Sequence, residues 1–244
     1  MEVMKLTMDF FIHTKDVNHN DIIRASAILD MFQDIAGIHA DKLKVGYEDL
    51  KEKNYAWVVL YQKFEIMALP PYLDFISLTT WPKPKQKLEF EREYFIKDKS
   101  GKELVKGISN WVVMDLNTRG LVRSRDIAFD GTYESFTNFE EKCKRRLNLD
   151  ETKIQNYLTY EVELEDIDHN GHMNNSRYLH IIEDRFHTFE SRVYIKTVEI
   201  SYLKEAKYKD KIQIGYYSID NKLAFIGYIQ DERCFECIIG EEQI

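Results

Sequence analysis

The chain contains a degenerate internal repeat, and this repeat restricts its possible folds more than any other feature. The run Asp16–Asn20 (Asp-Val-Asn-His-Asn) aligns with Asp166–Asn170 (Asp-Ile-Asp-His-Asn) at an offset of 150 residues, without a gap. The match continues downstream with Ser26 over Ser176, Leu29 over Leu179 and Asp34 over Asp184. A chain of 244 residues with such halves is expected to form two similar domains.

Alternating apolar residues predict five strands in each half, one before each copy of the run and four after it. In the first half the predicted strands are Lys5–Thr14, Trp57–Met67, Asp74–Trp81, Leu88–Lys97 and Glu103–Leu116. In the second half they are Tyr157–Leu164, Val193–Leu203, Lys211–Ile219, Leu223–Gln230 and Arg233–Ile239.

A helical pattern follows each copy of the run. Apolar residues three and four apart predict a helix over Ile22–Lys42, with Asp21 as its N-cap. The second helix is expected to be capped by Asn174 or Asn175 and to end near Arg192. One antiparallel sheet can wrap one long apolar helix, an arrangement called a hot-dog fold. We therefore predict an α+β chain with two tandem hot-dog domains, 1–125 and 156–244, and a connector over 126–155.

The two copies differ in their ionisable groups. Asp168 is matched by Asn18, and His172 is matched by Ile22. A run this polar is not a core segment, because each buried polar group would need a partner. If it were only a turn, both halves could use the same residues. The difference predicts chemistry in the second half, although free drift of a duplicated turn is the simpler alternative.

One motif in the second half resembles the signature of a known enzyme family. Its residues are Asp168, Asn170, His172, Asn174, Asn175 and Tyr178. Their spacing is similar to that of fatty acyl-acyl carrier protein (acyl-ACP) thioesterases of plant plastids and bacteria, and the double hot-dog layout covers nearly the whole chain. Glu205 matches a further carboxylate of that family. Plant members tend to carry a cysteine next, where this chain has Ala206, so water remains as the nucleophile.

The resemblance implies four catalytic residues. Thioester hydrolysis needs a base for water and donors for the developing oxyanion. Glu205 or His172 could activate the water, and Asn170 could orient it or bind the thioester carbonyl. Asp168 could orient His172, as a carboxylate orients imidazole in a catalytic triad. Backbone N–H groups at Asn174–Ser176 offer a further oxyanion site.

The resemblance also implies that the first half holds the acyl chain. Met31, Phe32 and Ile35 of the first predicted helix are candidates for setting the preferred length, although a plain core role fits them equally well. Asn174 and Asn175 are candidate substrate contacts in addition to their expected role as helix caps.

Charge and composition limit the possible partners. The net charge of −8 argues against general nucleic-acid binding. An acyl carrier protein could still dock on a local basic cluster. No cofactor is expected, and no metal, because Asp168, His169 and His172 lack further ligand support. The basic clusters are Lys83, Lys85 and Lys87; Arg119, Arg123 and Arg125; and Lys142, Lys144, Arg145 and Arg146.

The location is predicted from three further features. No apolar run approaches the roughly 20 residues of a transmembrane helix, and the first ten residues lack the continuous apolar stretch of a signal peptide. Three cysteines are a poor disulfide framework. We expect a cytoplasmic protein without membrane insertion, for which a homodimer is one option.

The predicted function is hydrolysis of fatty acyl-ACP by activated water, which releases free fatty acid and ends chain elongation. Two alternatives stay open, a hot-dog thioesterase that acts on acyl-coenzyme A and a non-catalytic acyl-binding module. A hot-dog dehydratase is less favoured, because Asn170 and Glu205 in a two-half chain resemble a hydrolase more.

Overall fold

The computed structural model describes residues 4–127, 129, 131–140, 143–186 and 193–244, and both halves follow the predicted order of elements. The first half contains β1 (Leu6–Phe11), α1 (Ala25–Lys42), α2 (Tyr47–Lys51), β2 (Tyr55–Ile66), β3 (Phe75–Pro82), β4 (Glu89–Lys97) and β5 (Glu103–Asp115). The second contains β6 (Asn156–Glu161), α3 (Asn175–Phe186), β7 (Val193–Tyr202), β8 (Lys211–Ile219), β9 (Lys222–Ile229) and β10 (Glu232–Gln243). The short helix α2 was not predicted.

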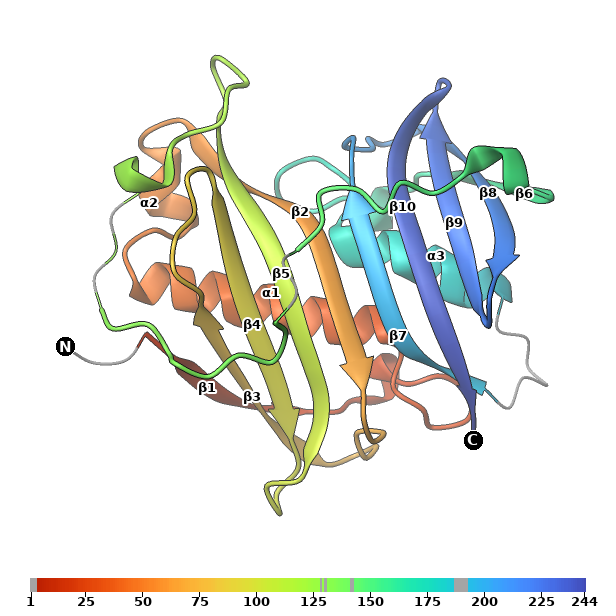
Figure 1. Cartoon of the computed structure of the whole chain (residues 1–244), viewed down its shortest axis with the longest axis horizontal. Coiled ribbons are helices and arrows are strands. Elements are labelled where there is room, and N and C mark those ends of the chain that lie inside the picture. The colour runs from red at the N-terminus through yellow and green to blue at the C-terminus, as the bar shows by residue number, and fades with distance from the viewer. Residues whose placement is uncertain (1–3, 128, 130, 141–142, 187–192) are drawn as a thin grey trace.

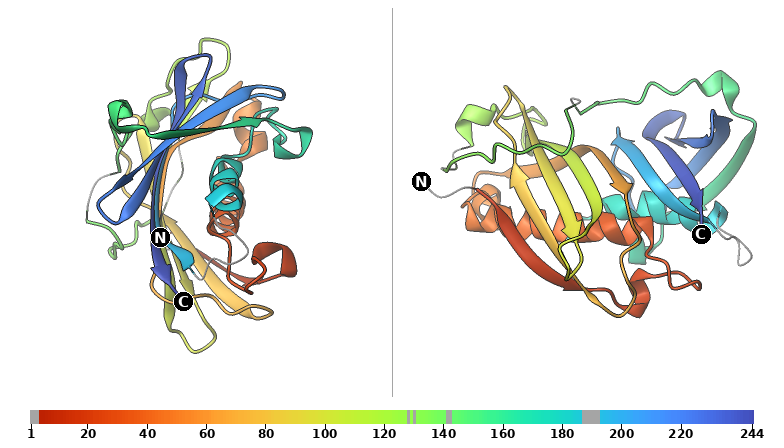
Figure 2. Two further views of the ribbon diagram at one scale, coloured as in Figure 1. Left: turned by 90° about the vertical axis from the view of Figure 1, so that its right-hand side faces the viewer. Right: turned by 60° about the horizontal axis from the view of Figure 1, so that its bottom comes forward.

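The strands of the two halves form one antiparallel sheet in the order β1-β3-β4-β5-β2-β7-β10-β9-β8-β6. The halves join where β2 pairs with β7, from Tyr61 opposite Ser201 to Glu65 opposite Thr197. The sheet curves around α1 and α3, which lie along the same face of it (Figures 1 and 2). This arrangement confirms the predicted α+β class, with a helix wrapped by antiparallel strands in each half.

The predicted strands differ from the observed ones mainly at their ends. β1 and β6 are shorter than predicted because Thr14–Asp16 and Leu164–Asp166 form 3-10 turns. β10 continues to Gln243, past the predicted end at Ile239, because its polar end still pairs with β7. The pattern of side chains does not reveal an extension that depends on backbone hydrogen bonds to another strand.

The first helix begins at Ala25, so the prediction of a start at Ile22 with Asp21 as N-cap is wrong. Asp21 has a left-handed backbone (φ 59°) inside the preceding turn. The carboxylate of Glu183, on α3, accepts hydrogen bonds from the backbone N–H groups of Ala25 (2.6 Å) and Ser26 (3.0 Å) instead. A cap that comes from 158 residues away leaves no local signal in the sequence.

The second helix begins as predicted. The side-chain oxygen of Asn174 accepts a hydrogen bond from the backbone N–H of Ser176 (3.1 Å), which is N-cap geometry for a helix that starts at Asn175. The predicted end near Arg192 lies outside the described residues.

The main core lies between the helices and the concave face of the sheet, and it is continuous across the two halves. Ile28 and Leu29 of α1 and Leu179 and Ile182 of α3 are almost fully buried in it. Because α1 and α3 also contact each other, the two halves share one core and do not have a separate core each.

The segment between the halves crosses the outer face of the sheet and is held there by carboxylates of the strands (Figure 1). Glu93 of β4 is fully buried and accepts a hydrogen bond from the backbone N–H of Asn138 (2.8 Å). Glu236 of β10 accepts from the backbone N–H groups of Leu147 (2.8 Å) and Asn148 (3.0 Å). Carboxylates on the outer face of the strands thus hold the connecting segment through its backbone N–H groups.

Three findings concern predicted absences. In the part of the chain that the structure describes, no helix is long and apolar enough to cross a membrane. Over the same residues, no group of three or more His, Cys, Asp or Glu side chains is placed to hold a metal ion. Cys143, Cys234 and Cys237 are free thiols.

Candidate active site

Both copies of the repeat form the same turn. The backbone N–H of Asn18 donates to the carbonyl of Ile22 (2.8 Å), and that of Asp168 donates to the carbonyl of His172 (2.8 Å). The side chains at 18 and 168 each accept from the backbone N–H two residues later, at 2.9 and 2.8 Å. The turn therefore forms with either a carboxamide or a carboxylate, so the charge of Asp168 is not needed for the turn.

The second turn presents His172 to Glu205. The imidazole Nε2 of His172 lies 3.3 Å from Oε2 of Glu205, and the two side chains are 26% and 33% exposed. The loop of Glu205 is held by the motif itself, because Met173 N–H donates to the carbonyl of Ala206 (2.8 Å). The backbone N–H of Ala206 in turn donates to the hydroxyl of Tyr178 (3.1 Å). Tyr178 thus has a positioning role that the sequence did not suggest.

Asp168 contacts different groups from those expected. Its carboxylate accepts from the backbone N–H of Asn170 (2.8 Å), from the Asn170 carboxamide (3.4 Å) and from the backbone N–H of His172 (3.5 Å). The expected contact with the His172 imidazole is made by Glu205 instead. The turn geometry explains this, because it directs the Asp168 oxygens toward the backbone that follows.

Arg119 is a site residue that the sequence placed only in a basic cluster. Its guanidinium NH2 lies 3.2 Å from Oε2 of Glu205, so this oxygen faces both Arg119 and His172. Arg119 follows β5 in the first half, with a left-handed backbone (φ 57°). The contact spans 86 residues and the boundary between the halves, and no local pattern predicts it.

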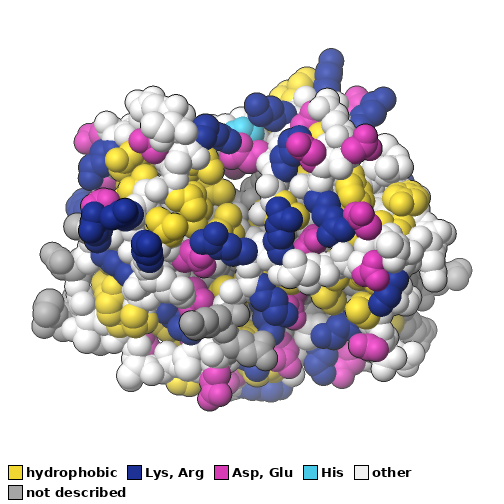
Figure 3. Space-filling view, turned by 45° about the horizontal axis from the view of Figure 1, so that its top comes forward, with side chains coloured by type: hydrophobic (Ala, Val, Ile, Leu, Met, Phe, Trp, Pro, Cys, Tyr) yellow, Lys and Arg dark blue, Asp and Glu magenta, His cyan; other side chains and the backbone are white. Residues whose placement is uncertain are grey.

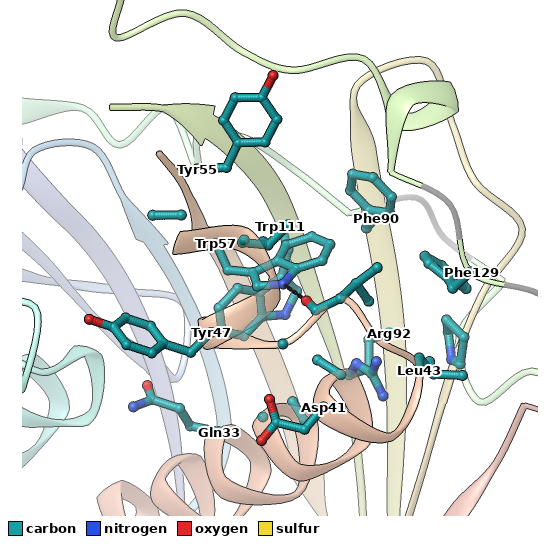
Figure 4. A pocket seen from close by; sticks show the side chains of 18 of the residues that line it. Gln33, Asp41, Leu43, Tyr47, Tyr55, Trp57, Phe90, Arg92, Trp111 and Phe129 are labelled. Carbon is teal, nitrogen blue, oxygen red and sulfur yellow. Dashed lines mark hydrogen bonds between the residues drawn. The ribbon is translucent and has the colours of Figure 1, made fainter. Parts of the chain in front are cut away.

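A cavity of about 220 Å³ runs between the halves next to this turn. The first half supplies aromatic walls, including Trp57, Phe90 and Trp111, and the indole N–H of Trp57 donates to the carbonyl of Val45 at 2.8 Å (Figure 4). His169 packs edge-on against Tyr47, with ring centroids 4.9 Å apart. The second half supplies Asp168, His169, Asn170 and Asn175.

The three α1 residues expected to contact the acyl chain lie in the core. Met31, Phe32 and Ile35 are buried between α1 and the sheet. The cavity is lined instead by the adjacent face of the same helix, which carries residues spaced three and four apart. Those residues are Gln33, Ala36, Gly37, Ala40 and Asp41.

The N-termini of the two helices differ in what their first residues bind. The first N–H of α1, at Ala25, is bound by the carboxylate of Glu183. At the equivalent position in α3, the Asn175 side chain donates to the carboxamide oxygen of Gln33 (3.2 Å). Among the described residues, the backbone N–H of Asn175 has no hydrogen-bond acceptor. This donor lies on the cavity wall, at the positive end of a helix dipole.

His39 meets Arg92, one of the residues that line the cavity. Nδ1 of His39 lies 2.9 Å from the guanidinium of Arg92, so this nitrogen accepts and the imidazole is neutral. Burial and the nearby charges of Arg92 and Lys42 lower the pKa of His39 to about 3.

This shift predicts an acid-sensitive fold. The unfolded chain binds a proton at His39 below about pH 6.5, whereas the folded protein binds it only near pH 3. The free energy of unfolding should therefore fall with decreasing pH in that window, with a slope from this group of up to about 1.4 kcal/mol per pH unit. His39→Gln should flatten the dependence in urea unfolding curves. His13→Gln, at an exposed position, is the control, and an unchanged slope in His39→Gln would contradict the prediction.

Comparison with known families supports the family resemblance of the motif from Asp168 to Tyr178. The family model of the acyl-ACP thioesterase N-terminal domain matches residues 4–129, and that of the C-terminal domain matches residues 149–233. The oleoyl-acyl carrier protein thioesterase of Coriandrum sativum (chloroplastic) is 22% identical over 83% of this chain and 60% of its own length. Oleoyl-acyl carrier protein thioesterase 2 of Arabidopsis thaliana (chloroplastic) is 22% identical over 82% of this chain and 59% of its own length. The chain thus spans about 60% of the length of these relatives.

Solved structures share the fold. An acyl-ACP thioesterase from Bacteroides thetaiotaomicron superposes with a TM-score of 0.86 at 23% identity, over 98% of both chains. A 12:0-ACP thioesterase from Umbellularia californica superposes with a TM-score of 0.82 at 16% identity, over 100% of this chain and 99% of the other. Since the two family models together cover most of its length, the chain belongs to the acyl-ACP thioesterase family.

Proposed function

We propose that the protein hydrolyses the thioester of a fatty acyl-acyl carrier protein with water, releasing free fatty acid and ending chain elongation. One observation carries this proposal. Asp168 and Asn170 line an aromatic-walled cavity, and the His172–Glu205 pair lies in the same turn and its neighbouring loop. An acyl chain in the cavity would bring its thioester carbonyl to the polar residues of the second half.

In the proposed mechanism His172 is the base. Its Nε2–H donates to Glu205, which leaves the lone pair of Nδ1 free to take a proton from water. Arg119 holds the same carboxylate oxygen and keeps Glu205 in this orienting role. The hydroxide attacks the carbonyl carbon, and the C–S bond then breaks as the imidazolium returns its proton to the thiolate.

The oxyanion would be held by neutral donors. The Asn170 carboxamide and the backbone N–H of Asn175 belong to residues that line the cavity, and both could donate to the oxygen of the tetrahedral intermediate. Asp168 accepts from both the backbone and the carboxamide of Asn170, and so fixes its direction. Asp168 is thus a positioning residue for Asn170 in this scheme.

The first half would hold the acyl chain in the aromatic cavity. Met31, Phe32 and Ile35 would then affect chain length from behind its wall, since they pack in the adjoining core. Asn175 would contact substrate directly, while Asn174 would hold the helix start. The cytoplasmic location and a homodimer stay predictions, the former supported by the free thiols.

The proposed substrate carrier is the acyl carrier protein. Lysine and arginine side chains, with some acidic ones among them, lie around hydrophobic side chains on the face shown in Figure 3. A basic rim of this kind suits an acidic protein partner. The two alternative functions make different predictions from this one. A thioesterase for acyl-coenzyme A needs only a pocket for the phosphates of coenzyme A, and an acyl-binding module would not turn over its substrate.

The test is hydrolysis of one acyl group on two carriers. We expect kcat/KM at least about tenfold higher for acyl-ACP than for the same acyl-coenzyme A, with the difference shrinking as salt screens the protein–protein contact. Equal or faster hydrolysis of acyl-coenzyme A would favour the first alternative. Binding of both thioesters without turnover would favour the acyl-binding module.

A further inference from the structure

Each long helix places one side chain at the N-terminus of the other long helix, and the two side chains occupy equivalent positions of the repeat. Gln33 of α1 aligns with Glu183 of α3 at the offset of 150 residues. Glu183 contacts Ala25, the first residue of α1, and Gln33 contacts Asn175, the first residue of α3. Ala25 and Asn175 are also 150 positions apart. The two contacts are therefore related by the same repeat, and they differ in one functional group.

In the first half, the oxygens of Glu183 occupy the helix N-terminus. One oxygen accepts a hydrogen bond from the backbone N–H of Ala25 (2.6 Å), and the other accepts from that of Ser26 (3.0 Å). The contact is buried, since Glu183 is only 5% exposed. The oxyanion of a tetrahedral thioester intermediate needs the same kind of N–H donors. The position of the Glu183 oxygens therefore indicates where such an oxygen would lie at the start of α3.

In the second half, a carboxamide stands at the equivalent position and leaves the helix N-terminus unfilled. Oε1 of Gln33 accepts from the side chain of Asn175 (3.2 Å) and not from its backbone N–H. Within the described residues this is the one hydrogen bond of the Gln33 side chain, so its amide N–H donors have no protein acceptor. The backbone N–H of Asn175 has none either among these residues. Gln33 extends from α1 into the cavity that Asn175 also lines (Figure 4).

We infer that Gln33 is a further catalytic residue, a hydrogen-bond donor from the first half to the oxyanion that forms at the start of α3. The thioester oxygen would lie between the Gln33 amide and the backbone N–H of Asn175, and both hydrogen bonds would strengthen as the oxygen becomes negative. The proton balance of hydrolysis is unchanged, because the carboxamide donates a hydrogen bond and keeps its protons. This inference rests on the proposed thioesterase function and adds a residue of the first half to its reaction centre.

Two substitutions of Gln33 test the inference in the full chain, with the acyl-ACP that the wild type hydrolyses fastest. Gln33→Met keeps the length of the side chain and removes its donors, so kcat should fall about 10²-fold with little change in KM. Gln33→Glu should lower kcat at least as much, because its carboxylate cannot donate and repels the oxyanion. If Gln33 only held the side chain of Asn175, Gln33→Glu would stay active, since a carboxylate accepts the same hydrogen bond. Wild-type kcat in either variant overturns the inference.

Glu183→Gln is the matched control, at the equivalent position of α3. It should destabilise the fold, because the start of α1 loses a charged acceptor, and it should keep kcat near the wild-type value. An equal loss of kcat in Glu183→Gln and Gln33→Glu would assign both effects to the contact between the helices and overturn the inference. If Gln33→Met does not fold, Gln33→Glu decides the case. A wild-type protein that turns over no acyl-ACP overturns the proposed function and the inference with it, whereas failure of the inference alone leaves wild-type turnover standing.

Discussion

His172→Ala is expected to lower kcat for acyl-ACP hydrolysis by about 10²- to 10⁴-fold, because it removes the base proposed to take the proton from water. Asp168→Ala should also abolish most of the activity, because Asn170 loses the carboxylate that fixes both its backbone and its carboxamide. Single-turnover rates with saturating enzyme would measure the chemical step and separate it from carrier binding.

The silent copy of the turn provides the matched control. Asn18→Ala removes the same side chain–backbone hydrogen bonds as Asp168→Ala, at the equivalent position of the first half. Asn18→Ala should destabilise the protein slightly and leave kcat near that of the wild type. A loss of activity as large in Asn18→Ala as in Asp168→Ala would mean that both turns serve only the fold. Wild-type rates in His172→Ala would exclude it as the base.

Asp166→Ala is expected to cost about 3–5 kcal/mol of unfolding free energy, the largest stability effect of a single change in the motif. Asp166 is fully buried, and one of its oxygens lies 2.7 Å from Nε of Arg177. The other oxygen accepts from the Tyr160 hydroxyl (2.6 Å) and from the backbone N–H of Glu163 (2.9 Å). Removing the carboxylate leaves the Arg177 guanidinium beside the core with the exposed Glu165, at 3.5 Å, as its remaining ion-pair partner among the described residues.

Asp16→Ala is the control for this prediction. Asp16 also accepts a hydrogen bond from a backbone N–H at the start of its 3-10 turn, that of His13 (2.8 Å), but it is only half-buried. Its loss should cost about 1 kcal/mol, as for an ordinary hydrogen bond. Urea unfolding of both variants measures the difference. Similar losses in the two variants would show that the turn, and not the buried ion pair, accounts for the effect of Asp166→Ala.

Asp166 also shows where sequence interpretation fails. It lies in a turn, but the expectation that the polar run is not a core segment is wrong for Asp166, which is fully buried. The residue that makes its burial possible is Arg177, eleven positions away on α3. A run of polar residues suggests exposure to solvent, but a polar side chain can be buried when hydrogen-bond partners satisfy it. The sequence of the run does not reveal those partners.

The sequence by itself determined the features that depend on near neighbours along the chain. The repeat at Asp16–Asn20 and Asp166–Asn170 predicted two similar halves, since alternation and helical spacing are local periodicities. Asn174 as the cap of α3 was predictable for the same reason. The motif from Asp168 to Tyr178 indicated the family, which the family models confirm.

Only the tertiary structure decided which distant groups meet. Glu183 binds the N-terminus of α1, Arg119 reaches Glu205, and Arg92 and Asn170 from different halves line one cavity. Each of these contacts joins elements far apart in the chain, and several cross from one half to the other. Their formation follows from the pairing of β2 with β7, which merges the halves into one sheet and brings their charged side chains within range of each other.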